Sequence, residues 1–190
     1  MTNFLRLILA LGVLAAVPPL SSQRALADAK APVIAVINYA VAIRESKAGQ
    51  SVREQVDKQR AIYEKEIKAA QTKLEDARQE LAQQQAVLSP EAFARKRQEF
   101  QQQASELQRT AQSRKRSLDQ MQGNGFRIIE DAVREILQEL VKERGFDIVM
   151  NAGPGAGAII LASKELFITE EVVARLDKKL PKVSVKPTSE

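Results

Sequence analysis

The stretch that decides the fold is LAQQQAVLSPEAFARKR, residues 81–97, because one helical pattern ends and another begins within it. Ser89 is a favourable N-cap residue, Pro90 suits the first position of a helix, and the glutamate that follows places a negative charge in the first turn. On both sides the chain is dense in Ala, Glu, Gln, Lys, Arg and Leu, which are strong helix formers. The stretch therefore predicts a tight connection between two long helices, over residues 46–89 and 90–144.

Both predicted helices carry a heptad-like seam, whose members are alternately four and three positions apart. Helices joined by so short a turn run antiparallel. The first helix alone, at 1.5 Å per residue, would be about 65 Å long, so the hairpin must project from the rest of the protein. The predicted seam consists of Tyr63, Ile67, Ala70, Leu74, Ala77, Leu81, Gln84 and Leu88 in the first helix, and of Phe93, Arg97, Phe100, Ala104, Leu107, Ala111, Arg114, Leu118, Met121, Gly125, Ile128 and Ala132 in the second.

Three short apolar segments outside the hairpin, residues 32–38, 146–150 and 158–162, are predicted strands. Gly145 is predicted to end the second helix. Three short strands and one small helix bury too little apolar surface by themselves, so the sequence favours association between copies of the chain. The expected oligomer core consists of Val33, Ile34, Val36, Ile37, Ile148, Val149, Ile159, Ile160 and Leu161.

The C-terminal segment is predicted to form one short helix over residues 169–180, with Thr169 as its N-cap, followed by a loose, flexible tail over residues 181–190. The expected fold class is α+β, predominantly α. A long antiparallel helical hairpin, residues 46–143, would project from a small β body that forms by oligomerisation. That body would contain residues 28–45 and 144–180.

The first 27 residues have the layout of a secretory signal peptide. One arginine precedes an apolar run from Leu7 to Val17, two prolines follow the run, and Ala25-Leu26-Ala27 offers a cleavage site. The run is about half as long as the roughly 20 apolar residues that cross a bilayer, which favours cleavage after Ala27 over a retained anchor. Cleavage would lower the net charge from +5 to +3. Export to the periplasm disfavours nucleic acid as the partner of this basic chain.

The composition excludes several classes of functional site. The chain has no Cys and no His, so it has no disulfide, no thiolate or imidazole metal site, and no Ser-His or Cys-His nucleophile pair. The glycine-rich segment 153–157 lacks the Lys-Ser/Thr and the helix that follow a phosphate-binding loop. Carboxylate pairs such as Glu64 and Glu66 lie among lysines, which is typical of a solvated helix face. The sequence therefore predicts no enzyme, no cofactor and no metal.

The second helix carries the features that could bind a partner. Residues 90–122 contain seven Lys and Arg against four Asp and Glu, an excess of +3, whereas the first helix has an excess of +1. Two explanations of this excess stay open. The charge can simply keep the helix soluble, or it can form a cationic surface that binds anionic lipid or an acidic client. Two phenylalanines near the turn are expected to pack in the seam. The candidate contact residues are Phe93, Arg95, Lys96, Arg97, Phe100, Arg114, Lys115 and Arg116.

Two glycines, Gly123 and Gly125, lie in the middle of the second helix. Each costs about 1 kcal/mol of helix stability relative to alanine. They are either a tolerated pair of weak helix formers or a bending point of the arm. We name them as a candidate hinge.

The order of these features resembles the Skp/OmpH family of periplasmic chaperones. The strand IAVIN at 34–38, the long hairpin, FDIVMN at 146–151 and ITEEVVARLDKKL at 168–180 carry the resemblance, which extends over essentially the whole mature chain. It implies a homotrimer in which the strands assemble a central β body, while three helical arms enclose a cavity for unfolded outer-membrane proteins. It also implies a basic lipopolysaccharide site on the arms, for which Arg95, Lys96 and Arg97 are candidates by their chemistry.

The expected function is therefore that of an ATP-independent holdase, which keeps unfolded outer-membrane proteins from aggregating. Two alternatives stay open. A structural coiled-coil adaptor of the cell envelope would need a well-formed seam and one specific partner. A cationic protein that binds lipopolysaccharide or anionic lipid would depend on the basic triplets.

Overall fold

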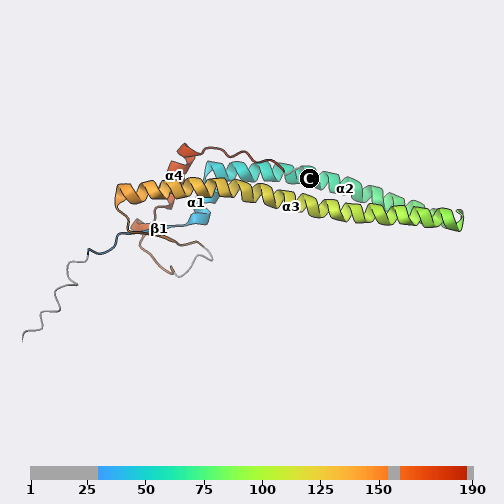
Figure 1. Ribbon diagram of the computed structural model, residues 1–190, viewed down its shortest axis with the longest axis horizontal. Coiled ribbons are helices and arrows are strands. Elements are labelled where there is room, and N and C mark those ends of the chain that lie inside the picture. The colour runs from blue at the N-terminus through green and yellow to red at the C-terminus, as the bar shows by residue number, and fades with distance from the viewer. Residues whose placement is uncertain (1–29, 154–158, 188–190) are drawn as a thin grey trace, which may run out of the picture. The chain divides into compact units, whose positions relative to one another are not determined.

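The computed structural model describes residues 30–153 and 159–187, and Pro32–Glu190 form one compact unit. The expected signal peptide and residues 154–157 of the glycine-rich segment lie outside the described residues. Within the described residues, no helix combines the length and the apolar character needed to span a bilayer. The elements, shown in Figure 1, are β1 (Ile34–Ile37), α1 (Tyr39–Glu45), α2 (Lys47–Gln84), α3 (Pro90–Arg144), β2 (Ile148–Asn151), the 3-10 helix η1 (Lys164–Leu166) and α4 (Thr169–Lys179).

The two long helices form the predicted hairpin. Helices α2 and α3 lie side by side along their length and meet at a tight connection (Figure 1). Ser89 caps α3 by accepting a hydrogen bond from the amide of Ala92 at 3.3 Å, and Pro90 is the first helical residue. At the other end Gly145 adopts the left-handed conformation, with φ of 67°, and ends α3 where the sequence predicts. At 1.5 Å per residue α2 is about 57 Å long and α3 about 82 Å.

A short helix, α1, precedes the hairpin and was not predicted. It turns into α2 at Ser46, which is fully buried. The hydroxyl of Ser46 accepts from the amide of Gly49 at 3.1 Å and donates to the carbonyl of Ile43 at 2.9 Å. The amide of Lys47 donates to Asp177 of α4 at 2.7 Å, so a second side chain satisfies the N-terminus of α2. The corner between α1 and α2 is therefore closed by hydrogen bonds from both sides.

The sheet has two parallel strands, in which Ile34 of β1 lies opposite Ile148 of β2. The third predicted strand, residues 158–162, is wrong for the described part, since residues 159–162 form no regular element. The free edge of β1 is taken instead by Phe167, which makes a single bridge to Val36. An apolar run becomes a strand only where a neighbour satisfies its backbone, and within the described residues no such neighbour reaches 159–162.

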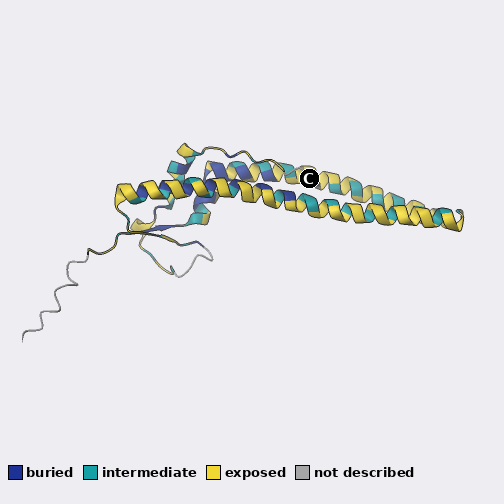
Figure 2. Ribbon diagram, in the orientation of Figure 1, coloured by how far each residue is buried: buried dark blue, intermediate teal, exposed yellow. Residues whose placement is uncertain are grey.

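The core lies at the base of the hairpin, where Figure 2 shows the buried residues gathered. Ala48, Val52 and Val56 of α2 pack there against residues of α3, α1, α4 and β1. Two members of the expected oligomer core, Val36 and Ile37, are each 2% exposed within the single chain. The chain's own helices cover β1, so burying it does not require a second copy. The remaining buried core residues on the C-terminal side are Met121, Ile129, Val133, Ile136, Leu140, Ile168, Val172, Leu176 and Val183.

Helix α4 begins one residue earlier than its predicted cap implies. Its N-cap is Ile168, and the hydroxyl of Thr169 instead accepts from the amide of Asn38 at 2.9 Å. Tertiary contact with the end of β1 thus outweighs the local capping preference of threonine. Arg175 holds α4 to α3 by donating two hydrogen bonds to Glu143, and this pairing keeps the pKa of the Glu143 carboxyl below its usual value.

The C-terminal tail, predicted to be loose and flexible, lies against the hairpin over its described residues (Figure 1). Val183 is 3% exposed and belongs to the core. The serine and glutamine of α2 at positions 51 and 55 hydrogen-bond to the tail backbone. The prediction of a loose tail, made from its proline and charge content, was wrong here. Alternate tail residues are apolar, and they pack on α2 and α3.

Candidate functional site

The part of the hairpin that projects beyond the core is residues 64–116, which we call the outer arm. The structure describes all of these residues, and none of them is buried. The predicted arm, residues 46–143, was too long, because the first turns of α2 and the last turns of α3 belong to the core. The outer arm is therefore two helices held together by one half-buried seam (Figure 2).

The predicted seam of the first helix is confirmed from Tyr63 to Gln84, since each of these residues is less exposed than its neighbours. Helix α2 ends at Gln84 and not at residue 89 as predicted, so the last predicted seam residue, Leu88, is half-buried in the connection. In α3 the prediction was wrong at three positions. Arg97 and Ala111 are exposed, and Thr110 takes the place of the latter. Ile129 is fully buried whereas Ile128 is 45% exposed. With two isoleucines side by side, the spacing of apolar residues does not decide which of them is buried. Packing against the facing helix decides it.

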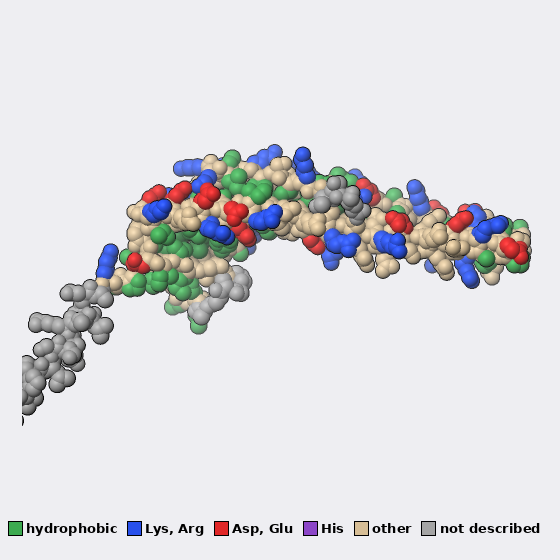
Figure 3. All heavy atoms as spheres, viewed as in Figure 1, with side chains coloured by type: hydrophobic (Ala, Val, Ile, Leu, Met, Phe, Trp, Pro, Cys, Tyr) green, Lys and Arg blue, Asp and Glu red, His purple; other side chains and the backbone are tan. Residues whose placement is uncertain are grey.

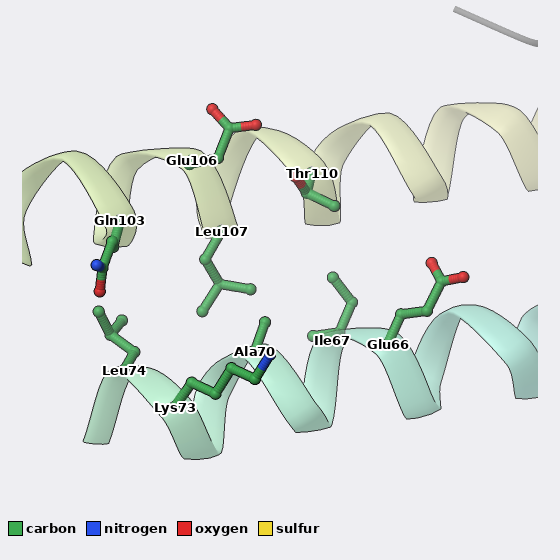
Figure 4. A pocket seen from close by; sticks show the side chains of 9 residues that line it. All are labelled: Glu66, Ile67, Ala70, Lys73, Leu74, Gln103, Glu106, Leu107 and Thr110. Carbon is green, nitrogen blue, oxygen red and sulfur yellow. The ribbon is translucent and has the colours of Figure 1, made fainter. Parts of the chain in front are cut away.

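The seam of the outer arm leaves an open cavity of about 250 Å³ between the helices. In Figure 4, Ile67, Ala70 and Leu74 point from α2 toward α3, and Leu107 points back toward them. Glu106 points away from the cavity. The small side chain of Ala70 is too short to fill the space opposite Leu107. The complete lining is Glu66, Ile67, Ala70, Lys73, Leu74, Gln103, Glu106, Leu107 and Thr110.

Filling this cavity is expected to stiffen the arm. Ala70→Leu adds three carbon atoms to the apolar lining, and their burial should raise the free energy of unfolding by up to about 2 kcal/mol. Hydrogen exchange of residues 64–116 should slow. Ala69→Leu is the matched control, because Ala69 is exposed on the same turn of α2 and its side chain would gain no burial. Equal exchange rates in the two variants would show that the cavity does not determine the stiffness of the arm.

Arg114 occupies a seam position by pairing with two residues of α2. Its guanidinium lies over the ring of Tyr63, 4.6 Å from the centroid. Its Nε is 3.3 Å from a carboxylate oxygen of Glu66, an ion pair without hydrogen-bond geometry. The Tyr63 hydroxyl in turn lies 3.4 Å from Ser117. Arg114 therefore links α3 to α2 at the base of the outer arm. Its aliphatic stem is packed against the protein, and its guanidinium is only partly exposed to water.

The other predicted contact residues all lie within the outer arm. Phe93 and Phe100 are half-buried in the seam, as their spacing predicts. Lys96, and not Arg97, reaches across the hairpin, where its ammonium lies 3.9 Å from Glu80. Arg95, Arg97, Lys115 and Arg116 are exposed. On the visible face, basic and acidic side chains alternate along the arm, whereas apolar side chains gather at the base (Figure 3).

The two candidate hinge glycines have different surroundings. Helix α3 is continuous through both. Gly123 is exposed, and a Cβ added there would meet nothing within 4 Å. Gly125 is buried, and an added Cβ would lie 2.7 Å from Val52 and 3.0 Å from Val185. Gly125 therefore permits close packing of α2 and the tail on α3, a reason for glycine that the sequence pattern did not reveal.

The predicted oligomer core is divided between the interior and the surface of the chain. Val36 and Ile37 are interior, and Val33, Ile34, Val149 and Ile159 are half-buried. Ile148 is 46% exposed, and Ile160 and Leu161 are almost fully exposed. Met150 and Phe167, which were not predicted, are also exposed. In the described residues, β2 and the segment that follows it thus leave six apolar side chains exposed: Ile148, Met150, Ile160, Leu161, Leu166 and Phe167.

The described residues contain no group of three or more carboxylates placed to hold a metal ion. What the arrangement offers is a long, two-helix surface with mixed charge, a thin seam and an open apolar cavity.

Comparison with known proteins agrees with this architecture. Residues 33–176 match the family model described as outer membrane protein (OmpH-like). No curated protein matches the chain. Among solved structures, a proposed outer membrane chaperone (OmpH-like) from Caulobacter crescentus superposes with a TM-score of 0.74 at 17% identity, covering 85% of this chain and 93% of the other. At that identity the likeness shows the fold, and the fold is the α+β, predominantly α arrangement that the sequence predicts.

Proposed function

The chain belongs to the OmpH-like family, and from this premise we propose that it is an ATP-independent holdase of the periplasm. Its clients would be unfolded outer-membrane proteins on their way to the outer membrane. The family and the fold of its structural relative support a chaperone role. In this proposal the arm holds clients and delays their aggregation.

The observation that carries this proposal is the construction of the outer arm. Residues 64–116 contain no buried residue, so few apolar contacts resist a change in the spacing of the two helices. A strand of an unfolded β-barrel protein is apolar on alternate residues and aggregates with other strands in water. An arm with a half-buried seam, an apolar cavity and mixed charges can make many weak contacts with such a chain and release it later.

We further propose that copies of the chain associate through the exposed apolar residues of β2 and of the segment that follows it, as a homotrimer by the family resemblance. Burying apolar side chains between copies is favoured over leaving them exposed to water. Ile160 and Leu161, 97% and 92% exposed, supply the strongest driving force. Three arms rising from one body would then surround a common space. The mass of the purified protein, measured by light scattering, tests this step, and a monomer would contradict it.

The holdase proposal is tested by diluting a denatured outer-membrane protein from urea with and without this chain. The chain should suppress the light scattering of the client without ATP, and added salt should weaken the suppression in proportion to the electrostatic share. An equal concentration of an unrelated helical protein is the control. Scattering that is the same with and without the chain would contradict the proposal.

Binding of lipopolysaccharide or anionic lipid is the second candidate function. Within the described residues, Arg95 and Arg97 form no ion pair, which leaves their charges free for a partner. Charge reversal at Arg95, Lys96 and Arg97 should abolish binding to anionic vesicles if this function is right, and should only reduce client capture if the holdase function is right. A specific adaptor role is less favoured, because the open cavity interrupts the seam that would dock a partner helix.

A further inference from the structure

The hydrogen bonds that hold the C-terminal tail on α2 are made to backbone atoms of the tail. The side-chain amide of Gln55 donates from Nε2 to the carbonyl of Val183 at 2.7 Å. Its Oε1 accepts from the amide of Val185 at 3.1 Å. The hydroxyl of Ser51 also donates to the Val183 carbonyl, at 3.2 Å. We call the four residues that receive the tail, Ser51, Val52, Gln55 and Gly125, the tail seat.

The pairing made by Gln55 reproduces one step of a parallel β ladder. In such a ladder one residue donates to the carbonyl of residue i on its neighbour and accepts from the amide of residue i+2. The amide of Gln55 does both, with Val183 as residue i and Val185 as residue i+2. Nε2 also donates to the carbonyl of Ser51 at 2.8 Å, which fixes the orientation of the amide. Because these contacts go to backbone atoms, the seat recognises an extended chain of almost any sequence.

The seat adds a preference for apolar residues at every second position. Val183 is buried and Val185 half-buried, whereas Ser184 and Lys186 are exposed. This alternation is that of an extended segment with one face against the protein. The side chain of Val185 reaches the backbone of α3 because position 125 is a glycine, where a Cβ would lie 3.0 Å from it. The seat therefore fits a segment with modest apolar side chains at i and i+2 and polar side chains between them.

We propose that the tail seat is a binding site for extended client strands, and that residues 182–187 of the tail are an internal occupant that clients displace. This inference rests on the proposed function and names its site and its regulation. The strands of outer-membrane β-barrels alternate apolar and polar residues, as Val183–Lys186 do. The tail would keep the seat from binding strands of other copies when no client is present. A client at high local concentration, held on the arm, would replace it.

The test uses a labelled ten-residue peptide that alternates valine with serine or lysine, and the full chain. Fluorescence anisotropy gives the affinity. Val183→Asp should release the tail, since a carboxylate cannot stay buried there. The peptide should then bind about tenfold more tightly than to the unchanged chain, the factor expected if the tail fills the seat about nine-tenths of the time. Adding Gln55→Leu should reverse the gain.

Two controls separate the seat from general stickiness. Gln59→Leu changes a glutamine one turn further along α2, outside the tail seat, and should leave the affinity as it was. A peptide with N-methylvaline in place of valine lacks amide donors at the apolar positions and should bind poorly. Equal affinity for the unchanged chain and Val183→Asp, or no effect of Gln55→Leu, would overturn the proposal.

Hydrogen exchange on the unchanged chain tests whether the peptide displaces the tail, even if a variant fails to fold. The amide of Val185, bonded to Gln55, should be protected, and saturating peptide should remove that protection. A tail that stays protected would overturn the inference, while suppression of client aggregation in the same preparation would leave the holdase function standing. Conversely, displacement of the tail without any suppression would contradict only the holdase function.

Discussion

Gly49→Ala is expected to lower the free energy of unfolding by about 3 kcal/mol or more, because the added methyl group has no room. Its Cβ would overlap the carbonyl oxygen of Ile43 and lie 2.9 Å from the carbonyl carbon. These are backbone atoms, which cannot rotate away as a side chain can. The corner between α1 and α2 must open instead, and the buried hydrogen bonds of Ser46 would be lost with it.

Urea unfolding followed by circular dichroism, at one protein concentration, measures this effect. The matched control is Gly123→Ala, which changes the same residue type inside the other long helix. A Cβ at Gly123 meets nothing within 4 Å, so alanine should stabilise the helix there by about 0.5–1 kcal/mol. The two variants should therefore move the unfolding midpoint in opposite directions. Midpoints that shift together would contradict the packing at the corner.

Leu140→Ala is expected to cost about 2–5 kcal/mol, since Leu140 is fully buried and its removal leaves a cavity in a well-packed core. The same change at Leu81, which is half-buried in the outer arm, should cost about 1 kcal/mol, because water already reaches the site and the arm can close around the gap. Thermal or urea unfolding of the two variants measures how much stability each substitution costs, at the base and in the outer arm.

Hydrogen exchange extends this comparison to individual segments. In Leu140→Ala, protection should fall throughout the base, whereas Leu81→Ala should affect the outer arm alone. A loss of similar size for both variants would mean that the arm and the base unfold as one unit with equal packing. That result would remove the physical basis for an arm that adapts to its clients.

Local signals in the sequence were sufficient for the hairpin. Ser89 and Pro90 start α3, and Gly145 ends it, because capping and left-handed backbone geometry are properties of a few neighbouring residues. The seam of α2 was also predictable, since its members recur alternately four and three positions apart along the chain. The cavity at Ala70 follows from that seam, because alanine is too short to fill its place.

Contacts between segments far apart in the sequence decided the rest of the structure. Residues 159–162 have the composition of a strand, yet Phe167 takes the free edge of β1. Thr169 has the chemistry of an N-cap, yet it bonds to Asn38. The tail looks like a loose end, yet Val183 is buried on α2. In each case the sequence offered a suitable residue, and a partner more than 100 residues away determined its role.

The sequence by itself determined that this protein is a long helical hairpin on a small base, without His or Cys chemistry. Helix formation, capping and the choice of seam depend on residues within a turn or two of one another, so the chain states them locally. Tertiary structure decided which of two adjacent isoleucines faces the core, why Gly125 is a glycine, and where the tail lies. These depend on the shape of a facing surface, and a side chain at Gln55 acquires its meaning only when the backbone of Val183 and Val185 is brought beside it.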